Sequence, residues 1–155
     1  MATKKKKAAK RASAKRAPAK RPPARRQPET LRLRAVAPSL TTTDLQRSIA
    51  FYRDVLGFIV GEEWREKGAL MGVEIQAGAV TFMLGQDDFA KGRDRQKGVG
   101  TRIYCYTAQD IDRLAAQIRE RGGALDQEPK DMPWGDRAFM ISDPDGFKLT
   151  IVRGS

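Results

Sequence analysis

Residues 43–57 read TDLQRSIAFYRDVLG, and this stretch decides the fold. Thr43 followed three residues later by Gln46 matches a capping box, in which Thr43 begins a helix. Apolar side chains then recur at helical spacing from Leu45 to Leu56, and Gly57 supplies a left-handed stop. The stretch therefore predicts an amphipathic helix of about 12 residues with one buried face.

Strands are predicted on both sides of this helix. An alternating segment from Leu31 to about Leu40 precedes it and indicates a strand. Three further strands are predicted after it, over Phe58–Arg65, Ala69–Gln76 and Ala79–Leu84. A charged loop then runs from Gly85 to Gly98.

The same order of elements recurs in the second half of the chain. A strand is predicted over Gly100–Tyr106 and a helix over Asp110–Arg121. Corresponding landmarks of the two halves, such as Leu45 and Ile111, lie between 65 and 68 residues apart, which indicates an internal duplication. The remaining strands are predicted over Ala124–Gln127, Arg137–Ser142 and Phe147–Val152, the last two joined by the strong turn signal Asp143-Pro144-Asp145-Gly146.

Two motifs carry a family resemblance. The segment 44–58 and the pair Pro133-Trp134-Gly135 and Asp143-Pro144-Asp145-Gly146 resemble the vicinal-oxygen-chelate superfamily of glyoxalases, bleomycin-resistance proteins and extradiol dioxygenases. The Pro-Trp-Gly version is similar to bleomycin-resistance-type members. The resemblance implies an α+β fold in which two tandem βαβββ modules, about 31–85 and 99–153, form a curved mixed sheet cup.

The resemblance also implies where a divalent metal would be held, with one ligand from the first and one from the fourth strand of each module. These places fall at Ala37, at Phe82, near Thr101 or Ile103, and at Thr150. None of them is a usable ligand, and the whole chain contains no histidine, the commonest metal ligand at neutral pH. We therefore predict no metal, no cofactor and no catalytic residue.

Strand alternation predicts which side chains line the cup. They are mostly small and apolar, with a few hydroxyls, and such a lining suits an organic ligand. The predicted lining is Ala37, Ser39, Phe82, Thr101, Ile103, Cys105 and Thr150, with Trp64 and Trp134 near the rim, and Lys148 has the same parity as Thr150. The alternatives are that Phe82 and Ile103 fill a closed core, that Trp134 packs between modules, and that Cys105 is an ordinary buried thiol.

The basic character of the chain belongs to its N-terminal segment. Residues 1–28 hold 12 of the 30 Lys and Arg and none of the 19 acidic residues, so we predict a disordered basic tail over 1–30 ahead of a single domain over 31–155. The tail is predicted to contact nucleic acid or another polyanion non-specifically, and the alternative is a merely solubilising segment. No apolar stretch suggests a membrane span, and the single cysteine, Cys105, favours the reducing cytoplasm.

These observations predict a metal-independent small-molecule-binding protein that sequesters a drug or metabolite, rather than an enzyme. The resemblance to bleomycin-resistance proteins implies a homodimer. The alternative is a metal-dependent lyase, isomerase or dioxygenase of the same superfamily with atypical ligands.

Overall fold

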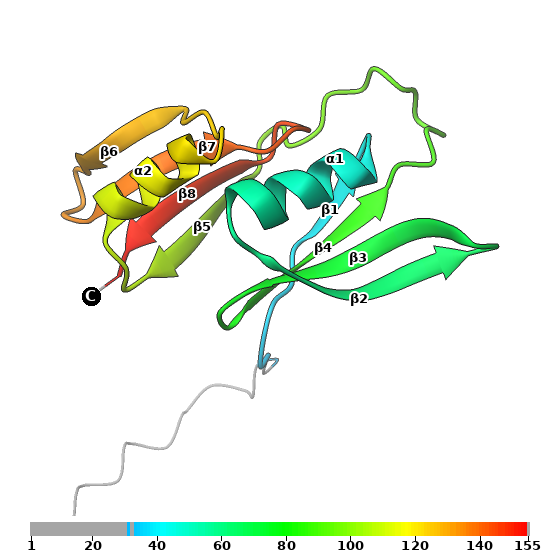
Figure 1. The fold of residues 1–155 in the computed structure, drawn as a ribbon, viewed down its shortest axis with the longest axis horizontal. Coiled ribbons are helices and arrows are strands. Elements are labelled where there is room, and N and C mark those ends of the chain that lie inside the picture. The colour runs from blue at the N-terminus through cyan, green and yellow to red at the C-terminus, as the bar shows by residue number, and fades with distance from the viewer. Residues whose placement is uncertain (1–30, 32, 155) are drawn as a thin grey trace, which may run out of the picture. The chain divides into compact units, whose positions relative to one another are not determined.

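The computed structural model describes residues 31 and 33–154, and in it each half of the domain forms one four-stranded sheet and one helix (Figure 1). The predicted tail lies outside the described residues. The first module contains β1 (Ser39–Thr42), α1 (Leu45–Ala50) with a continuing π-helical turn η1 (Phe51–Val55), β2 (Ile59–Glu66), β3 (Ala69–Ala77) and β4 (Val80–Gln86). The second contains β5 (Arg102–Thr107), α2 (Ile111–Glu120), β6 (Gln127–Asp131), β7 (Arg137–Ser142) and β8 (Lys148–Arg153).

The two sheets have the same topology. Their strand orders are β1-β4-β3-β2 and β5-β8-β7-β6. In each, the first strand of the module lies at an edge and pairs in parallel with the last, while the other pairs are antiparallel. This repeated arrangement confirms the predicted α+β fold of two βαβββ modules.

One hydrophobic core spans both modules. Tyr52 of η1 and Phe82 of β4 are joined in it by Ile111 of α2 and Phe139 of β7. The helices supply the buried stripe that their periodicity predicted, and each packs on one face of its own sheet. The opposite face of each sheet, turned away from the helix, is called the open face below.

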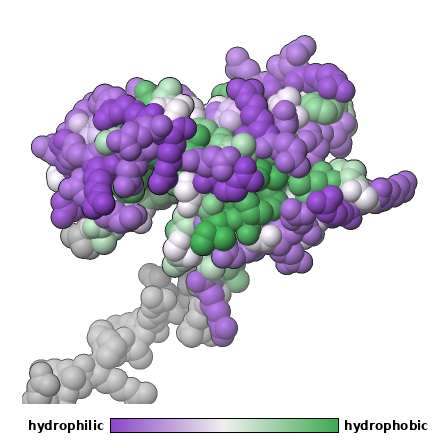
Figure 2. All heavy atoms as spheres, in the orientation of Figure 1, coloured by the Kyte–Doolittle hydropathy of each residue, from purple (hydrophilic) through white to green (hydrophobic). Residues whose placement is uncertain are grey.

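Seen from the helix side, the surface differs between the modules. Figure 2 shows hydrophobic surface gathered below α1, over the ribbon of β2–β4, whereas α2 and the loop after β4 are mostly hydrophilic. Phe58, Val60 and Leu70 are among the half-buried side chains packed against the core in the first module. In the described part of the chain, no helix combines the length and apolar character that crossing a membrane requires.

The first strand is shorter than its alternating sequence predicts. It begins at Ser39 rather than Leu31, and Leu31 and Leu33 are 84% and 75% exposed. Pro38 accepts a hydrogen bond from Met83 N–H but has no N–H of its own to extend the ladder. The alternation of apolar and polar residues ahead of Ser39 therefore does not correspond to a paired strand.

The cap of α1 differs by one residue from the prediction. Asp44, not Thr43, is the N-cap, and its Oδ1 accepts a hydrogen bond from Arg47 N–H at 3.0 Å. Thr43 instead bonds to Asp145 through both its N–H and its hydroxyl. Thr43 bonds to Asp145 rather than capping the helix because the Asp145 carboxylate accepts from both donors of Thr43.

The weak strand of the second module also lies later than predicted. It runs over Gln127–Asp131 instead of Ala124–Gln127. Its position is set by antiparallel pairing with β7, in which Gln127 pairs with Met140 and Asp131 with Arg137. The turn after Met132, closed by a hydrogen bond from Gly135 N–H, brings these two strands together.

Candidate functional site

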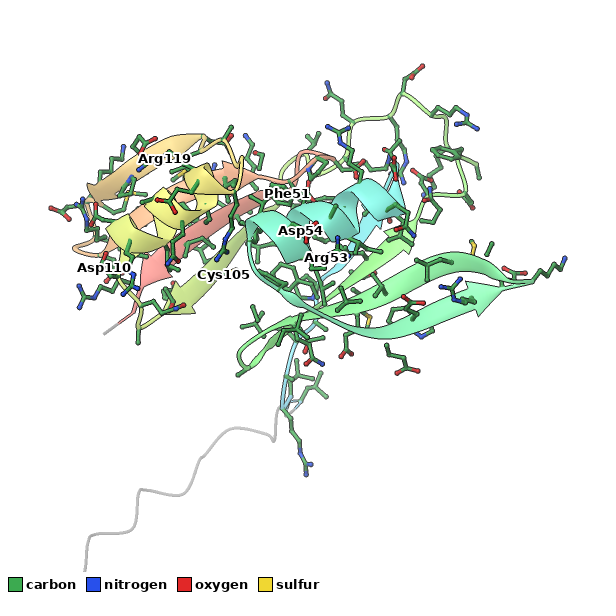
Figure 3. All side chains as sticks on the ribbon, in the orientation of Figure 1. Phe51, Arg53, Asp54, Cys105, Asp110 and Arg119 are labelled. Carbon is green, nitrogen blue, oxygen red and sulfur yellow. The ribbon has the colours of Figure 1, made fainter. Side chains whose placement is uncertain are left out.

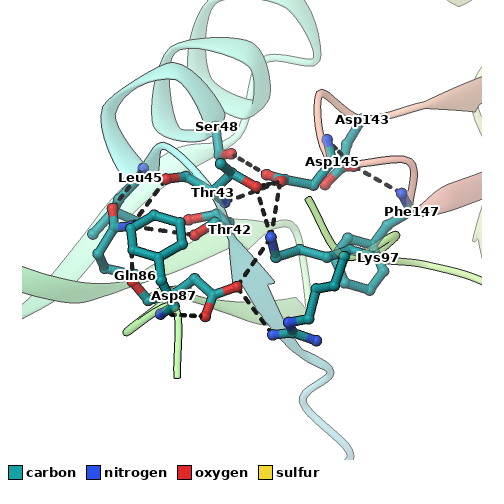
Figure 4. Close-up of polar contacts among 12 residues, drawn as sticks. Thr42, Thr43, Leu45, Ser48, Gln86, Asp87, Lys97, Asp143, Asp145 and Phe147 are labelled. Carbon is teal, nitrogen blue, oxygen red and sulfur yellow. Dashed lines mark hydrogen bonds and ion pairs between the residues drawn. The ribbon is translucent and has the colours of Figure 1, made fainter. Parts of the chain in front are cut away.

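A buried lysine connects the loop after β4 to the rest of the domain (Figure 4). The side chain of Lys97 is only 2% exposed, and its Nζ lies 3.0 Å from Asp87 Oδ2. Arg95 contacts the same carboxylate oxygen at 3.1 Å. The Lys97 ammonium, together with the Phe89 N–H, holds the pKa of Asp87 below its usual value. The loop predicted as 85–98 is therefore fastened at both ends by ion pairs.

The same ammonium reaches the start of α1 and the turn before β8 (Figure 4). It donates to Thr43 Oγ1 at 2.6 Å and lies 3.9 Å from Asp145 Oδ1. Asp145 also accepts from Ser48 Oγ at 3.3 Å. Thr43 of the first module and Asp145 of the second are thus joined across the module boundary, and the oxygens of Asp145 are already engaged.

A buried tyrosine makes a second bond between the modules. The Tyr52 hydroxyl donates to Asp143 Oδ2 at 3.1 Å. Asp143 Oδ1 accepts from the N–H groups of Asp145 and Phe147, which holds the predicted turn in shape. Burial raises the pKa of the Tyr52 phenol far above its usual value, and the neighbouring Asp143 carboxylate adds to the shift. Burial likewise raises the pKa of Asp143.

Stability at alkaline pH is expected to depend on Tyr52. Its folded-state pKa is raised, so its contribution is complete below about pH 10, where the unfolded phenol is also neutral, and is lost as pH rises further. The stability advantage of wild type over Tyr52→Phe should shrink by about 1.4 kcal/mol per pH unit above 10. Urea unfolding at pH 8, 10 and 11 measures this. Tyr106→Phe, at an exposed tyrosine, is the control, and its free energy of unfolding should fall above pH 10 as much as that of the wild type. If Tyr52→Phe lost as much stability above pH 10 as the wild type, the assignment would be contradicted.

A cavity of about 600 Å³ opens beside this network. Its walls are the loop 96–101, the start of β5 at Arg102, the turn 145–146 and Lys148 of β8. Arg102 and Lys148 are register partners on adjacent parallel strands. The cavity therefore carries charged side chains on its walls, and of the predicted lining only Thr101 and Lys148 belong to it.

Three of the predicted lining residues lie on the open faces. Ser39 pairs with Met83, Trp64 with Gly72, and Thr150 with Tyr104. The Trp64 ring lies over Gly72, where a Cβ would stand only 3.0 Å from Trp64 Cε3. Thr150 is fully buried although it is on an open face, and its hydroxyl has no hydrogen-bond partner among the described residues.

Three predicted lining residues are on the wrong face. Phe82 is 1% exposed and packs against Tyr52 and Phe58, with ring centroids 6.2 and 5.7 Å apart. Ile103 and Cys105 also pack against the core on the helix side. The predicted faces of β4 and β5 are therefore exchanged. In each strand the helix side buries the more apolar of the two alternating sets of side chains, and Phe82, Ile103 and Cys105 belong to that set.

Cys105 therefore has the alternative role, that of an ordinary half-buried thiol on β5 (Figure 3). Burial raises the pKa of the Cys105 thiol to about 11. Since the thiolate is the reactive form, this environment keeps Cys105 unreactive near neutral pH.

The other predicted residues are not brought together. Thr101 lines the cavity, whereas Ala37 is exposed ahead of β1 and Trp134 is 53% exposed in the turn between β6 and β7. Sequence reasoning missed Lys97 and Arg102. The sequence does contain a signal for Arg102, because Ile103 and Cys105 alternate with it along β5 and face the core.

The two fully buried threonines offer a matched comparison. Thr42 Oγ1 donates to Gly85 O at 3.2 Å, whereas Thr150 Oγ1 has no partner among the described residues. Thr42→Val is expected to lower the free energy of unfolding by about 1 kcal/mol, and Thr150→Val to raise it by about 1 kcal/mol, because only the second removes an unsatisfied polar group. Urea unfolding measures both; equal losses would contradict the assignment of the Thr150 hydroxyl.

The residues at the implied metal positions do not fit a divalent ion. β4 turns Met83 rather than Phe82 to the open face, and β5 turns Arg102 rather than Ile103. With Ala37 and Thr150 these provide no imidazole and no carboxylate, whereas zinc needs three protein ligands or more. Within the described residues, no group of three or more His, Cys, Asp or Glu side chains could hold a metal.

Comparison with known proteins decides the family. The model of the Glyoxalase/Bleomycin resistance protein/Dioxygenase superfamily matches residues 32–151. This chain belongs to that superfamily. The resemblance carried by the helix 1 and turn motifs is thereby confirmed, and the superfamily match covers both βαβββ modules of the structure.

Relatives of this superfamily member include enzymes. It is 27% identical over 133 residues to lactoylglutathione lyase from Salmonella typhimurium, covering 77% of this chain and 92% of the relative. It is 25% identical over 119 residues to glutathione transferase FosA from Serratia marcescens, covering 76% and 78%. Among solved structures, a superfamily member from Sphaerobacter thermophilus has 28% identity and a TM-score of 0.62, covering 77% of this chain and 98% of that one.

Proposed function

We propose that this superfamily member is a metal-independent small-molecule-binding protein that sequesters an organic ligand at the open faces of its sheets. The observation that carries the proposal is that the residues at the implied metal positions are not metal ligands. The family resemblance implies metal ligands at Ala37, at Phe82, near Thr101 or Ile103, and at Thr150, and the side chains that β4 and β5 turn to the open face beside these positions belong to Met83 and Arg102. A protein without those ligands retains a cavity and open sheet faces, which suit binding better than metal-assisted chemistry.

Ligand binding in the presence of a chelator tests the proposal. The purified full chain is titrated calorimetrically with a panel of neutral and anionic drugs and metabolites, before and after EDTA treatment. We expect saturable binding that EDTA leaves unchanged, and elemental analysis without stoichiometric zinc, nickel, iron or manganese. Binding or turnover that is lost with EDTA and restored by one metal would overturn the proposal.

The second candidate is an enzyme of the same superfamily with atypical ligands. The lyase and transferase names of the relatives support it. It predicts metal-dependent lyase, isomerase, transferase or dioxygenase turnover by the purified chain. The same elemental analysis, combined with a lactoylglutathione lyase assay, separates it from the binding function.

We further propose that the protein is a homodimer in the cytoplasm. Tyr104 and Tyr106 support a dimer because they stand on the open face of the edge strand β5 and are 46% and 66% exposed, and exposed aromatic side chains are typical of protein interfaces. The lone free thiol of Cys105 fits a reducing compartment. Analytical ultracentrifugation of wild type and of Tyr104→Ser/Tyr106→Ser tests the dimer, which the double variant should weaken; a monomeric wild type would refute it.

Contact of residues 1–28 with a polyanion stays part of the proposal. Their 12 cations and absence of acids support it, since such segments bind phosphates without sequence preference. Binding of duplex DNA should fall steeply with salt and be lost when these cations are replaced by glutamine. Equal binding by both forms at low salt would exclude the role.

A further inference from the structure

Two cations of the cavity wall, Arg102 and Lys148, have no acidic partner in the part of the chain that the structure describes. Arg102 of β5 and Lys148 of β8 are register partners, so their like charges stand side by side on the open face. Within residues 31 and 33–154, neither forms an ion pair, and the hydrogen bond found for the Arg102 guanidinium goes to Met140 Sδ. A thioether is only a weak acceptor, so the positive charge there is uncompensated.

Two acids near this pair, Asp87 and Asp145, are engaged by other groups. Asp87 faces Lys97 and Arg95, and Asp145 faces Lys97. Asp145 also accepts hydrogen bonds from Thr43 and Ser48 on the α1 side. Asp87 and Asp145 therefore form a network with Lys97 and Arg95 at one wall of the cavity, Asp143 bonds to Tyr52, and none of these acids forms an ion pair with Arg102 or Lys148.

We propose that this cavity binds the oxyanion group, a carboxylate or a phosphate-type group, of a small organic molecule through Arg102 and Lys148. The planar guanidinium can hold two oxygens of such a group, and the ammonium adds a compact point charge. Thr101, which also lines the cavity, adds a hydroxyl donor. The inference rests on the proposed binding function and adds the chemical class of the ligand.

The position of Arg102 also supports the binding of an oxyanion group. The family resemblance implies a metal ligand near Thr101 or Ile103, yet Arg102 is the residue between them that faces the open side. An exposed guanidinium thus stands on the open face, between the two positions at which the resemblance implies a ligand to a divalent cation. The positive charge needed to attract an anion is supplied here by the chain itself.

The cavity wall is rigid on the side of the loop. Gly98 has a φ of +69°, and a Cβ added there would stand 2.4 Å from Gly146 O. Lys97, next to it, is buried and ion-paired. A wall held in this way need not be ordered when the ligand binds, which favours affinity.

Residue-resolved titration with inorganic phosphate and with acetate tests the inference on the full chain. Amide resonances of Gly98–Arg102 are followed by 1H–15N NMR at constant ionic strength, with chloride replaced by the probe, so that binding to residues 1–28 is observed separately. We expect saturable shifts at Gly98–Arg102 with at least one of the two probes. In Arg102→Gln/Lys148→Gln the dissociation constant should rise about tenfold or more, corresponding to about 1.4 kcal/mol.

The matched control is Lys130→Gln/Arg153→Gln, which also removes two exposed cations from the second sheet but none from the cavity. It should bind the probe like the wild type. Equal weakening in both double variants, or no saturable shift with either probe, would overturn the inference. Organic ligands that bind equally to wild type and Arg102→Gln/Lys148→Gln would also overturn it while leaving the proposed function standing.

Discussion

Gly98→Ala is expected to lower the free energy of unfolding by about 3 kcal/mol, because it combines left-handed backbone strain with a clash that cannot relax. The φ of Gly98 is +69°, and its added Cβ would stand 2.4 Å from Gly146 O and 2.8 Å from Phe147 N. Both contacts are with backbone, so no side chain can rotate away. Relieving them would separate the loop from the turn that carries Asp145. Urea unfolding followed by circular dichroism measures the loss.

Gly100→Ala is the matched control for this prediction. Gly100 has a similar φ of +73°, but a Cβ there meets nothing within 4 Å. Its replacement should cost only the backbone strain, about 1 kcal/mol. The difference between the two variants therefore isolates the close approach of Gly98 to the turn. Similar losses at both glycines would show that the approach is not tight in solution.

Phe82→Ala is expected to lower the free energy of unfolding by about 3–5 kcal/mol, as for other buried aromatic side chains. Phe82 is 1% exposed and forms an aromatic cluster with Tyr52 and Phe58. Truncation would leave a cavity beneath α1 that these rings cannot fill without moving. Denaturant unfolding at neutral pH gives the loss directly.

Met83→Ala is the control for Phe82, because Met83 is the next residue of β4 and is half-buried on the open face. It should cost less than half as much, since fewer contacts are lost. A Phe82→Ala variant that keeps wild-type stability but loses ligand binding would reverse the assignment and restore Phe82 to the pocket.

The local sequence was sufficient to predict the repeated helices and strands, but it was insufficient to predict which face of each strand is buried. The spacing of Leu45, Ile49 and Tyr52 predicts the helix because its period is a property of the chain itself. In β5, the same kind of reasoning placed Ile103 on the open face, yet the structure buries it. A strand has two faces, and its alternation alone does not say which one meets a helix; a one-residue error exchanges them.

By itself, the sequence determined the two βαβββ modules, the Asp143–Gly146 turn, the superfamily and the absence of imidazole donors, because each depends on composition or on short-range spacing. The tertiary structure alone decided that Lys97 is buried between Asp87 and Asp145, and that Arg102 and Lys148 face one cavity. These contacts join residues up to about fifty positions apart, and such pairs are set by the register of parallel strands and the packing of loops. Strand alternation places Lys148 on the same face as Thr150, but no local pattern brings it beside Arg102 or buries Lys97 between two acids.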